Sequence, residues 1–87
     1  MLKIRLAVSG RGYHHSTDLP EFLELPEGAT LDEALAAIGE LLPPEGQLAR
    51  SALVAVSGRH VGTVGSHPPQ LLQPGDELVV IAPVAGG

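Results

Sequence analysis

Hydrophobic residues recur at every second position near the start of the chain, which is the period of a strand with one buried face. Between Leu2 and Val8 each even-numbered residue is aliphatic, and this predicts the first strand. The polar, glycine-containing segment 9–20 predicts a long hairpin connection. A short second strand is predicted over Phe22–Leu25, with Leu23 and Leu25 on one face.

A helical pattern begins after the turn residues 26–28. Thr30 is followed three residues later by Glu33, the arrangement of a capping box, so we expect a helix over 31–42 that ends before Pro43-Pro44. Its apolar positions have helical spacing and predict a stripe that faces a sheet. The stripe comprises Leu31, Leu35, Ile38 and Leu42, with Ala34 and Leu41 beside it, while Asp32, Glu33, Ala36 and Glu40 face water.

Two further strands and a short edge segment are predicted in the second half of the chain. Ala52–Val56 is an aliphatic run suited to a well-buried strand. The segment 57–60 predicts a tight turn that leads to a short edge segment over 61–64. Proline and glycine at the centre of 73–76 favour a type II turn, and the last strand is predicted over Glu77–Ile81.

The resulting order is strand, strand, helix, strand, short strand, strand. A hairpin, one helix and further strands in a chain of 87 residues predict an α+β fold with the helix packed across one face of a sheet, as in the β-grasp. We expect a β-grasp domain over 1–82 and a separate tail over 83–87. The expected core joins the helix to the sheet aliphatics, through Leu35, Ile38, Ile4, Leu6, Val54 and Val80.

Composition narrows the function. The chain has no cysteine, so it can hold neither a disulfide nor a sulfur nucleophile on its own side chains. Its formal net charge of -5 makes nucleic acid an improbable ligand. Neither a signal peptide nor an apolar run long enough to span a membrane is evident, so we expect a cytoplasmic protein that does not contact membrane.

The last five residues suggest where the chemistry lies. Pro83 restricts the root of this segment, Val84 and Ala85 are small, and Gly86-Gly87 carries no side-chain bulk. Fully extended, five residues span roughly 17 Å. We therefore expect the tail to enter a partner protein, with the carboxylate of Gly87 as the reactive group and with no catalytic residue in the chain itself.

Three segments resemble the ubiquitin-like sulfur carriers, a family that includes the small subunit of molybdopterin synthase and the thiamine-pathway sulfur carrier. These segments are 25–31 at the helix entry, 54–58 at the third strand's turn, and 72–78 together with 83–87. The resemblance implies that an E1-like enzyme uses ATP to adenylate Gly87. A sulfur donor then converts the acyl adenylate to a thiocarboxylate. It also implies no bound cofactor.

The ending Pro-Val-Ala-Gly-Gly favours the molybdopterin branch, whose partner is the larger catalytic subunit of molybdopterin synthase. Two other functions remain open. The chain could be a ubiquitin-like modifier conjugated to lysines through Gly87, or a β-grasp interaction module without carrier chemistry.

A further group of residues suggests a docking surface on the sheet. We expect part of one sheet face, including some of Val56, Val79 and Ile81, to be exposed and covered by a partner, with Arg59 beside it.

No metal site is expected, because the spacing of His14, His15, His60 and His67 matches no ligand motif, and all four are interpreted as exposed loop residues. Asp76 and Glu77 are not expected to act as a carboxylate pair in acid/base chemistry, since neighbours on a strand face opposite sides, and the acid here is interpreted as a turn residue.

Overall fold

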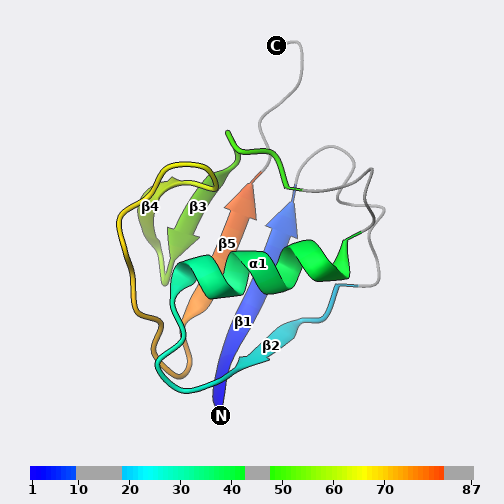
Figure 1. Cartoon of the computed structure of the whole chain (residues 1–87), viewed down its shortest axis with the longest axis vertical. Coiled ribbons are helices and arrows are strands. Elements are labelled where there is room, and N and C mark those ends of the chain that lie inside the picture. The colour runs from blue at the N-terminus through cyan, green and yellow to red at the C-terminus, as the bar shows by residue number, and fades with distance from the viewer. Residues whose placement is uncertain (10–18, 43–47, 82–87) are drawn as a thin grey trace.

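The computed structural model describes residues 1–9, 19–42 and 48–81 of the chain. These residues form a five-stranded mixed sheet and one helix, in the predicted order (Figure 1). The elements are β1 (Leu2–Ser9), β2 (Phe22–Leu25), α1 (Leu31–Leu41), β3 (Leu53–Val56), β4 (Arg59–Thr63) and β5 (Glu77–Ile81).

The last strand of the sequence is the middle strand of the sheet, whose order is β2-β1-β5-β3-β4. β5 pairs with β1 in parallel and with β3 antiparallel, whereas the outer pairs β1–β2 and β3–β4 are antiparallel. The sheet is therefore completed only when β5 inserts between β1 and β3. This is the β-grasp arrangement, and it confirms the predicted α+β fold.

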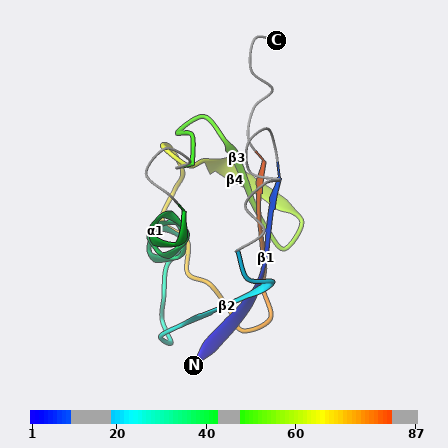
Figure 2. The ribbon, with the colours of Figure 1, turned by 90° about the vertical axis from the view of Figure 1, so that its right-hand side faces the viewer.

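α1 packs across one face of the sheet, and none of the other described elements covers the opposite face (Figure 2). The predicted capping box is present: the Glu33 amide donates to Thr30 Oγ1 at 3.3 Å, and the Thr30 amide donates to Glu33 Oε1 at 3.0 Å. The helix buries Leu31, Ala34, Leu35 and Ile38, and the C-cap residue Leu42 is also buried.

Helix and sheet share one aliphatic core, as predicted. Ile38 meets the strand residues that point to the same side, and Ile4, Val54 and Val80 are fully buried there. The remaining buried strand residues are Leu2, Leu6, Leu23, Leu25, Val56 and Leu78.

Two local predictions were wrong. Leu41, placed beside the apolar stripe, has 48% of its surface exposed, because at about 100° per residue it lies on the flank of the stripe and Leu42 takes the inward position. The turn after β3 is shorter than predicted: Ser57 and Gly58 have φ of 50° and 84°, values that suit a two-residue hairpin turn. Arg59 therefore already pairs with Val56, and β4 begins there.

Several predictions fall outside the described residues. These are the Pro43-Pro44 stop, most of the connection between β1 and β2, and the boundary between domain and tail. Within the described residues no helix is long and apolar enough to cross a membrane.

Candidate functional site

The end of β5 fixes the point from which the C-terminal segment departs. Ile81, the last residue of β5, is paired with Ser9 on one side and with Leu53 on the other. The segment thus leaves from the middle of the sheet, between two hydrogen-bonded neighbours. The predicted tail residues Pro83, Val84, Ala85, Gly86 and Gly87 lie outside the described residues.

An exposed apolar area surrounds this point on the face that α1 does not cover. Ile81 and Leu53 face each other across β5 and β3, with 44% and 45% of their surfaces exposed. One row further back, Val79 lies between Ala7 and Ala55, and all three alternate with the buried residues of their strands. We call these five residues the tail-root patch: Ala7, Leu53, Ala55, Val79 and Ile81.

Charged residues on the same face gather at its other end, where β1 begins. Lys3 Nζ lies 4.6 Å from the centre of the Phe22 ring, and Arg5 Nη2 lies 3.4 Å from Glu21 Oε2. Neither the Lys3–Phe22 ring contact nor the Arg5–Glu21 ion pair involves a residue of the tail-root patch. The open face therefore has a charged end and an apolar end, and β5 finishes at the apolar one.

The structure brings together only part of the predicted partner surface. Val79 and Ile81 belong to the tail-root patch as expected. Val56 does not: it is only 6% exposed, because it shares the parity of Val54 and points towards α1, opposite Leu78. Arg59 is exposed but pairs with Val56, three residues along β3 from Leu53, which corresponds to about 10 Å.

Leu53 was not predicted for this surface, although the sequence carried a signal for it. The run 52–56 was interpreted as well buried because all five residues are aliphatic. In the structure Ala52, Val54 and Val56 are buried while Leu53 is exposed. The alternation about Val54 could have identified Leu53 as an open-face residue.

The turn that precedes β5 is held by Asp76. Its carboxylate accepts from Ser57 Oγ at 2.7 Å and from the Gln73 amide at 2.7 Å. Ser57 in turn accepts from the Glu77 amide at 3.2 Å, and the Ser57 amide donates to the Glu77 carbonyl at 2.7 Å. Asp76 thus acts as a turn residue, as interpreted, and it links the β3–β4 turn to the start of β5.

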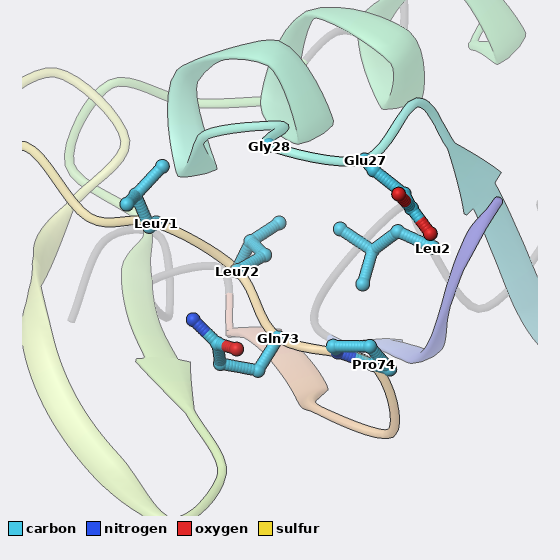
Figure 3. A pocket seen from close by; sticks show the side chains of 7 residues that line it. All are labelled: Leu2, Glu27, Gly28, Leu71, Leu72, Gln73 and Pro74. Atoms are coloured by element: carbon cyan, nitrogen blue, oxygen red, sulfur yellow. The ribbon is translucent and has the colours of Figure 1, made fainter.

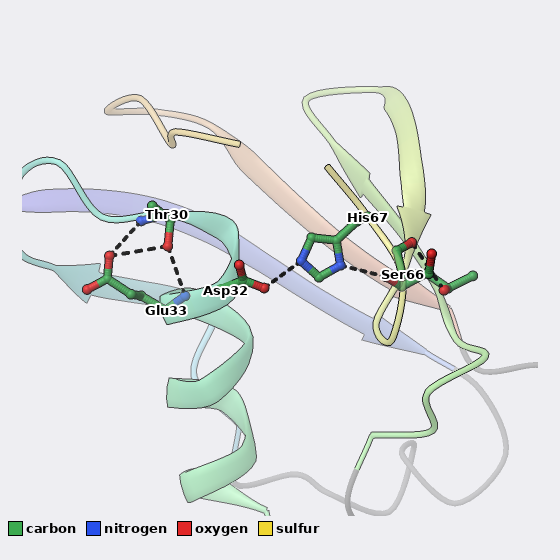
Figure 4. Close-up of polar contacts among 6 residues, drawn as sticks. Thr30, Asp32, Glu33, Ser66 and His67 are labelled. Atoms are coloured by element: carbon green, nitrogen blue, oxygen red, sulfur yellow. Dashed lines mark hydrogen bonds and ion pairs between the residues drawn. The ribbon is translucent and has the colours of Figure 1, made fainter. Parts of the chain in front are cut away.

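His67 is the histidine whose environment was predicted wrongly. Its side chain is only 6% exposed, and it bridges the end of β4 to the first turn of α1 (Figure 4). Its Nδ1 lies 2.7 Å from the Thr63 carbonyl and its Nε2 lies 2.7 Å from Asp32 Oδ1. His60 is exposed as interpreted, but it lies in β4 and not in a loop, whereas His14 and His15 lie outside the described residues. No group of three potential metal ligands gathers in the part of the chain that the structure describes.

A cavity of about 230 Å³ lies between the start of β1, the β2–α1 turn and the segment before β5 (Figure 3). Among the described residues that line it, Glu27 is the one charged side chain, and the others are Leu2, Gly28, Leu71, Leu72, Gln73 and Pro74. Because the cavity lies where β1 begins and β5 has not yet started, it is at the other end of the sheet from Ile81. It adds no reactive group to the region where the tail departs.

Comparison with known proteins gives a consistent result. The chain matches the ThiS family over residues 13–87, and no curated protein sequence gives a significant match. Among solved structures, a putative molybdopterin converting factor, subunit 1, from Pyrococcus furiosus is 23% identical, with a TM-score of 0.72 and coverage of 97% of this chain and 100% of that one.

A second similar structure is SAMP1 of Haloferax volcanii, a small archaeal modifier protein. It is 18% identical, with a TM-score of 0.68 and coverage of 98% of this chain and 99% of that one. At these identities the two structures support the fold, while the family match spans all but the first twelve residues, the Gly-Gly end included. The chain belongs to the ThiS family of ubiquitin-like sulfur carriers.

Proposed function

We propose that this protein carries sulfur as a thiocarboxylate on Gly87 and delivers it in molybdenum cofactor biosynthesis, as the small subunit of a molybdopterin synthase. The observation that carries the proposal is the family match, which extends through the Gly-Gly end. The fold is compatible with it, because the tail follows a strand fixed on both sides and the patch around its root is apolar and exposed.

A carboxylate is a poor electrophile, so the Gly87 carboxylate must be given a leaving group before sulfur can be attached. The Gly87 carboxylate attacks the α-phosphorus of ATP on an E1-like enzyme, which releases pyrophosphate and forms an acyl adenylate. A persulfide sulfur from a donor protein then attacks the carbonyl carbon and expels AMP. A thiolate then attacks the donor's sulfur in the resulting acyl disulfide, which breaks the S–S bond, forms a disulfide between that thiol and the donor, and leaves C(=O)S⁻ on Gly87.

The protein contributes positioning to these steps, while the partner enzymes contribute catalysis. The tail-root patch docks on the partner, and the extended tail of roughly 17 Å carries Gly87 into the partner's active site. Pro83 limits the freedom of the tail at its root, and Gly86 allows close approach to the nucleotide. The proposal includes a cytoplasmic location, where ATP would be available to the activating enzyme.

ATP–pyrophosphate exchange with the E1-like enzyme of the same organism tests the adenylation step. Deleting Gly87, or replacing Gly86 with Val, should abolish exchange and leave the thermal melt unchanged. Val84→Ala is the matched control, because it alters the tail without adding volume and should retain exchange. Full exchange without Gly87 would overturn the proposal.

The similarity to SAMP1 supports a second candidate, in which Gly87 is joined to lysines of other proteins. The same acyl adenylate would serve both functions, so pyrophosphate exchange does not separate them. Proteomic detection of Gly-Gly remnants from this chain on target lysines would favour the modifier. A chain that acquires neither sulfur nor protein adducts would instead be an interaction module.

A further inference from the structure

The segment that joins β4 to β5 is fastened to the start of α1 by backbone hydrogen bonds. The Leu31 amide donates to the Gln70 carbonyl at 2.8 Å, and the Leu72 amide donates to the Ala29 carbonyl at 3.0 Å. His67 adds a side-chain contact to this attachment, since it reaches Asp32 in the first turn of the helix. The segment leads directly to the turn that begins β5.

His67 is held in place by the backbone around it. The Thr63 amide donates to the Ser66 carbonyl at 2.8 Å, and the Ser66 amide donates back to the Thr63 carbonyl at 3.2 Å. Gly62 lies so close to this turn that a Cβ there would be 3.0 Å from the Cβ of His67. The imidazole lies between the Thr63 carbonyl and Asp32, with one ring nitrogen directed at each.

Both ring nitrogens face acceptors. A backbone carbonyl can only accept a hydrogen bond, and an ionised carboxylate can only accept as well. A neutral imidazole has one N–H, so it satisfies one of these contacts and turns a lone pair towards the other acceptor. An imidazolium has two N–H groups and satisfies both. With each nitrogen at 2.7 Å from its acceptor, the geometry favours the doubly protonated ring.

The charges around His67 agree with this assignment. From α1 the ring meets the Asp32 carboxylate, while Glu33 turns back to Thr30. From β4 the ring meets the Thr63 carbonyl. From the segment before β3, the Arg50 side chain lies against Gly65. A cation near a helix N-terminus is opposed by the helix dipole, and Asp32 offsets that effect.

We propose that His67 is an imidazolium in the folded protein and acts as a proton-dependent clasp between α1 and the segment that leads to β5. When the ring loses its proton, one of the two contacts is lost and the clasp loosens. The pKa of His67 agrees with this proposal. The hydrogen bond to the Thr63 carbonyl raises the pKa above its ordinary value of 6.5, burial opposes this increase, and Asp32 adds to it.

The clasp makes the stability of the fold depend on pH. Because the pKa of His67 is higher in the folded protein than in the unfolded chain, the clasp stabilises the fold fully below pH 6.5. The stabilisation is lost as the pH rises through the folded-state pKa. The melting temperature of the wild-type chain should therefore exceed that of His67→Gln most at mildly acidic pH, and the difference should shrink towards alkaline pH.

Imidazole ¹H–¹⁵N correlation spectra of the full chain test the proposal directly. At pH 6.5 the resonance that His67→Gln removes should show two protonated nitrogens, and Asp32→Asn should lower the pH at which it titrates. His60→Gln, on an exposed position of β4, is the matched control and should leave the pH dependence of the melt unchanged. A neutral tautomer at pH 6.5, or a melting difference that stays constant with pH, would overturn the clasp.

Discussion

Single residues decide where the backbone can pass closely, and Gly62 is the clearest case. It has φ of 147°, and a Cβ at this position would lie 2.5 Å from the Ser66 carbonyl oxygen. β4 can therefore turn back tightly at Thr63 only with glycine at this point. This requirement was not predicted, because the sequence around Gly62 does not reveal which atoms later approach it.

Replacing Gly62 with Ala should destabilise the fold by about 1–3 kcal/mol, from backbone strain and the clash with Ser66. Gly28→Ala is the matched control: Gly28 also has positive φ, at 85°, but an added Cβ would meet no atom within 4 Å. Chemical denaturation of both variants should show the larger loss for Gly62→Ala. Equal losses of stability would mean that the close approach of position 62 to the Ser66 carbonyl does not contribute to the destabilisation.

For the helix and the strands, sequence patterns that involve several residues were sufficient to locate the elements. The capping box at Thr30 and Glu33 located the start of α1, and alternation located β1 and β2. Signals that involve a single residue were less reliable. Leu41 and Val56 are both aliphatic, yet one is exposed and the other buried, because helix phase and strand parity decide burial and hydrophobicity alone does not.

The packing of α1 on the sheet should depend strongly on Ile38, which is fully buried. Ile38→Asp would bury an unpaired charge in a domain whose whole stability is on the order of 5–15 kcal/mol, and we expect it to unfold the chain. Ala36→Asp, on the exposed face of the same helix, should change stability by about 0.5 kcal/mol or less. Circular dichroism melts distinguish the two, and cooperative wild-type melting of Ile38→Asp would contradict the assigned core.

For the whole molecule, the important feature is that β5 ends beside an apolar patch on the face opposite α1. The sequence indicated two residues of the patch, Val79 and Ile81, while the predicted tail lies outside the described residues. Strand parity about Val54 could have assigned Leu53 to the open face and Val56 to the core. That Leu53 lies beside Ile81, however, depends on the register between strands that are distant in sequence. His67 was missed for the same reason: its partner Asp32 is 35 residues away.

Ile81→Arg should weaken binding to the E1-like enzyme about tenfold or more, since loss of a hot-spot residue near the centre of an interface costs about 2 kcal/mol or more. Leu41→Arg is the matched control, because Leu41 has similar exposure, 48% against 44%, but lies on the helix. Isothermal titration calorimetry should show weaker binding for Ile81→Arg alone. Equal affinities for both variants would show that the tail-root patch is not the docking surface.

The central claim is that Gly87 carries sulfur, and the intact mass of the protein from its native cells tests it most directly. We expect a population in which one sulfur has replaced one oxygen, with fragmentation placing the change on Gly87. That population should disappear in cells that lack the activating enzyme. A chain that does not end at Gly87, or one whose mass never includes the added sulfur while the activating enzyme and sulfur donor are present, would contradict the account.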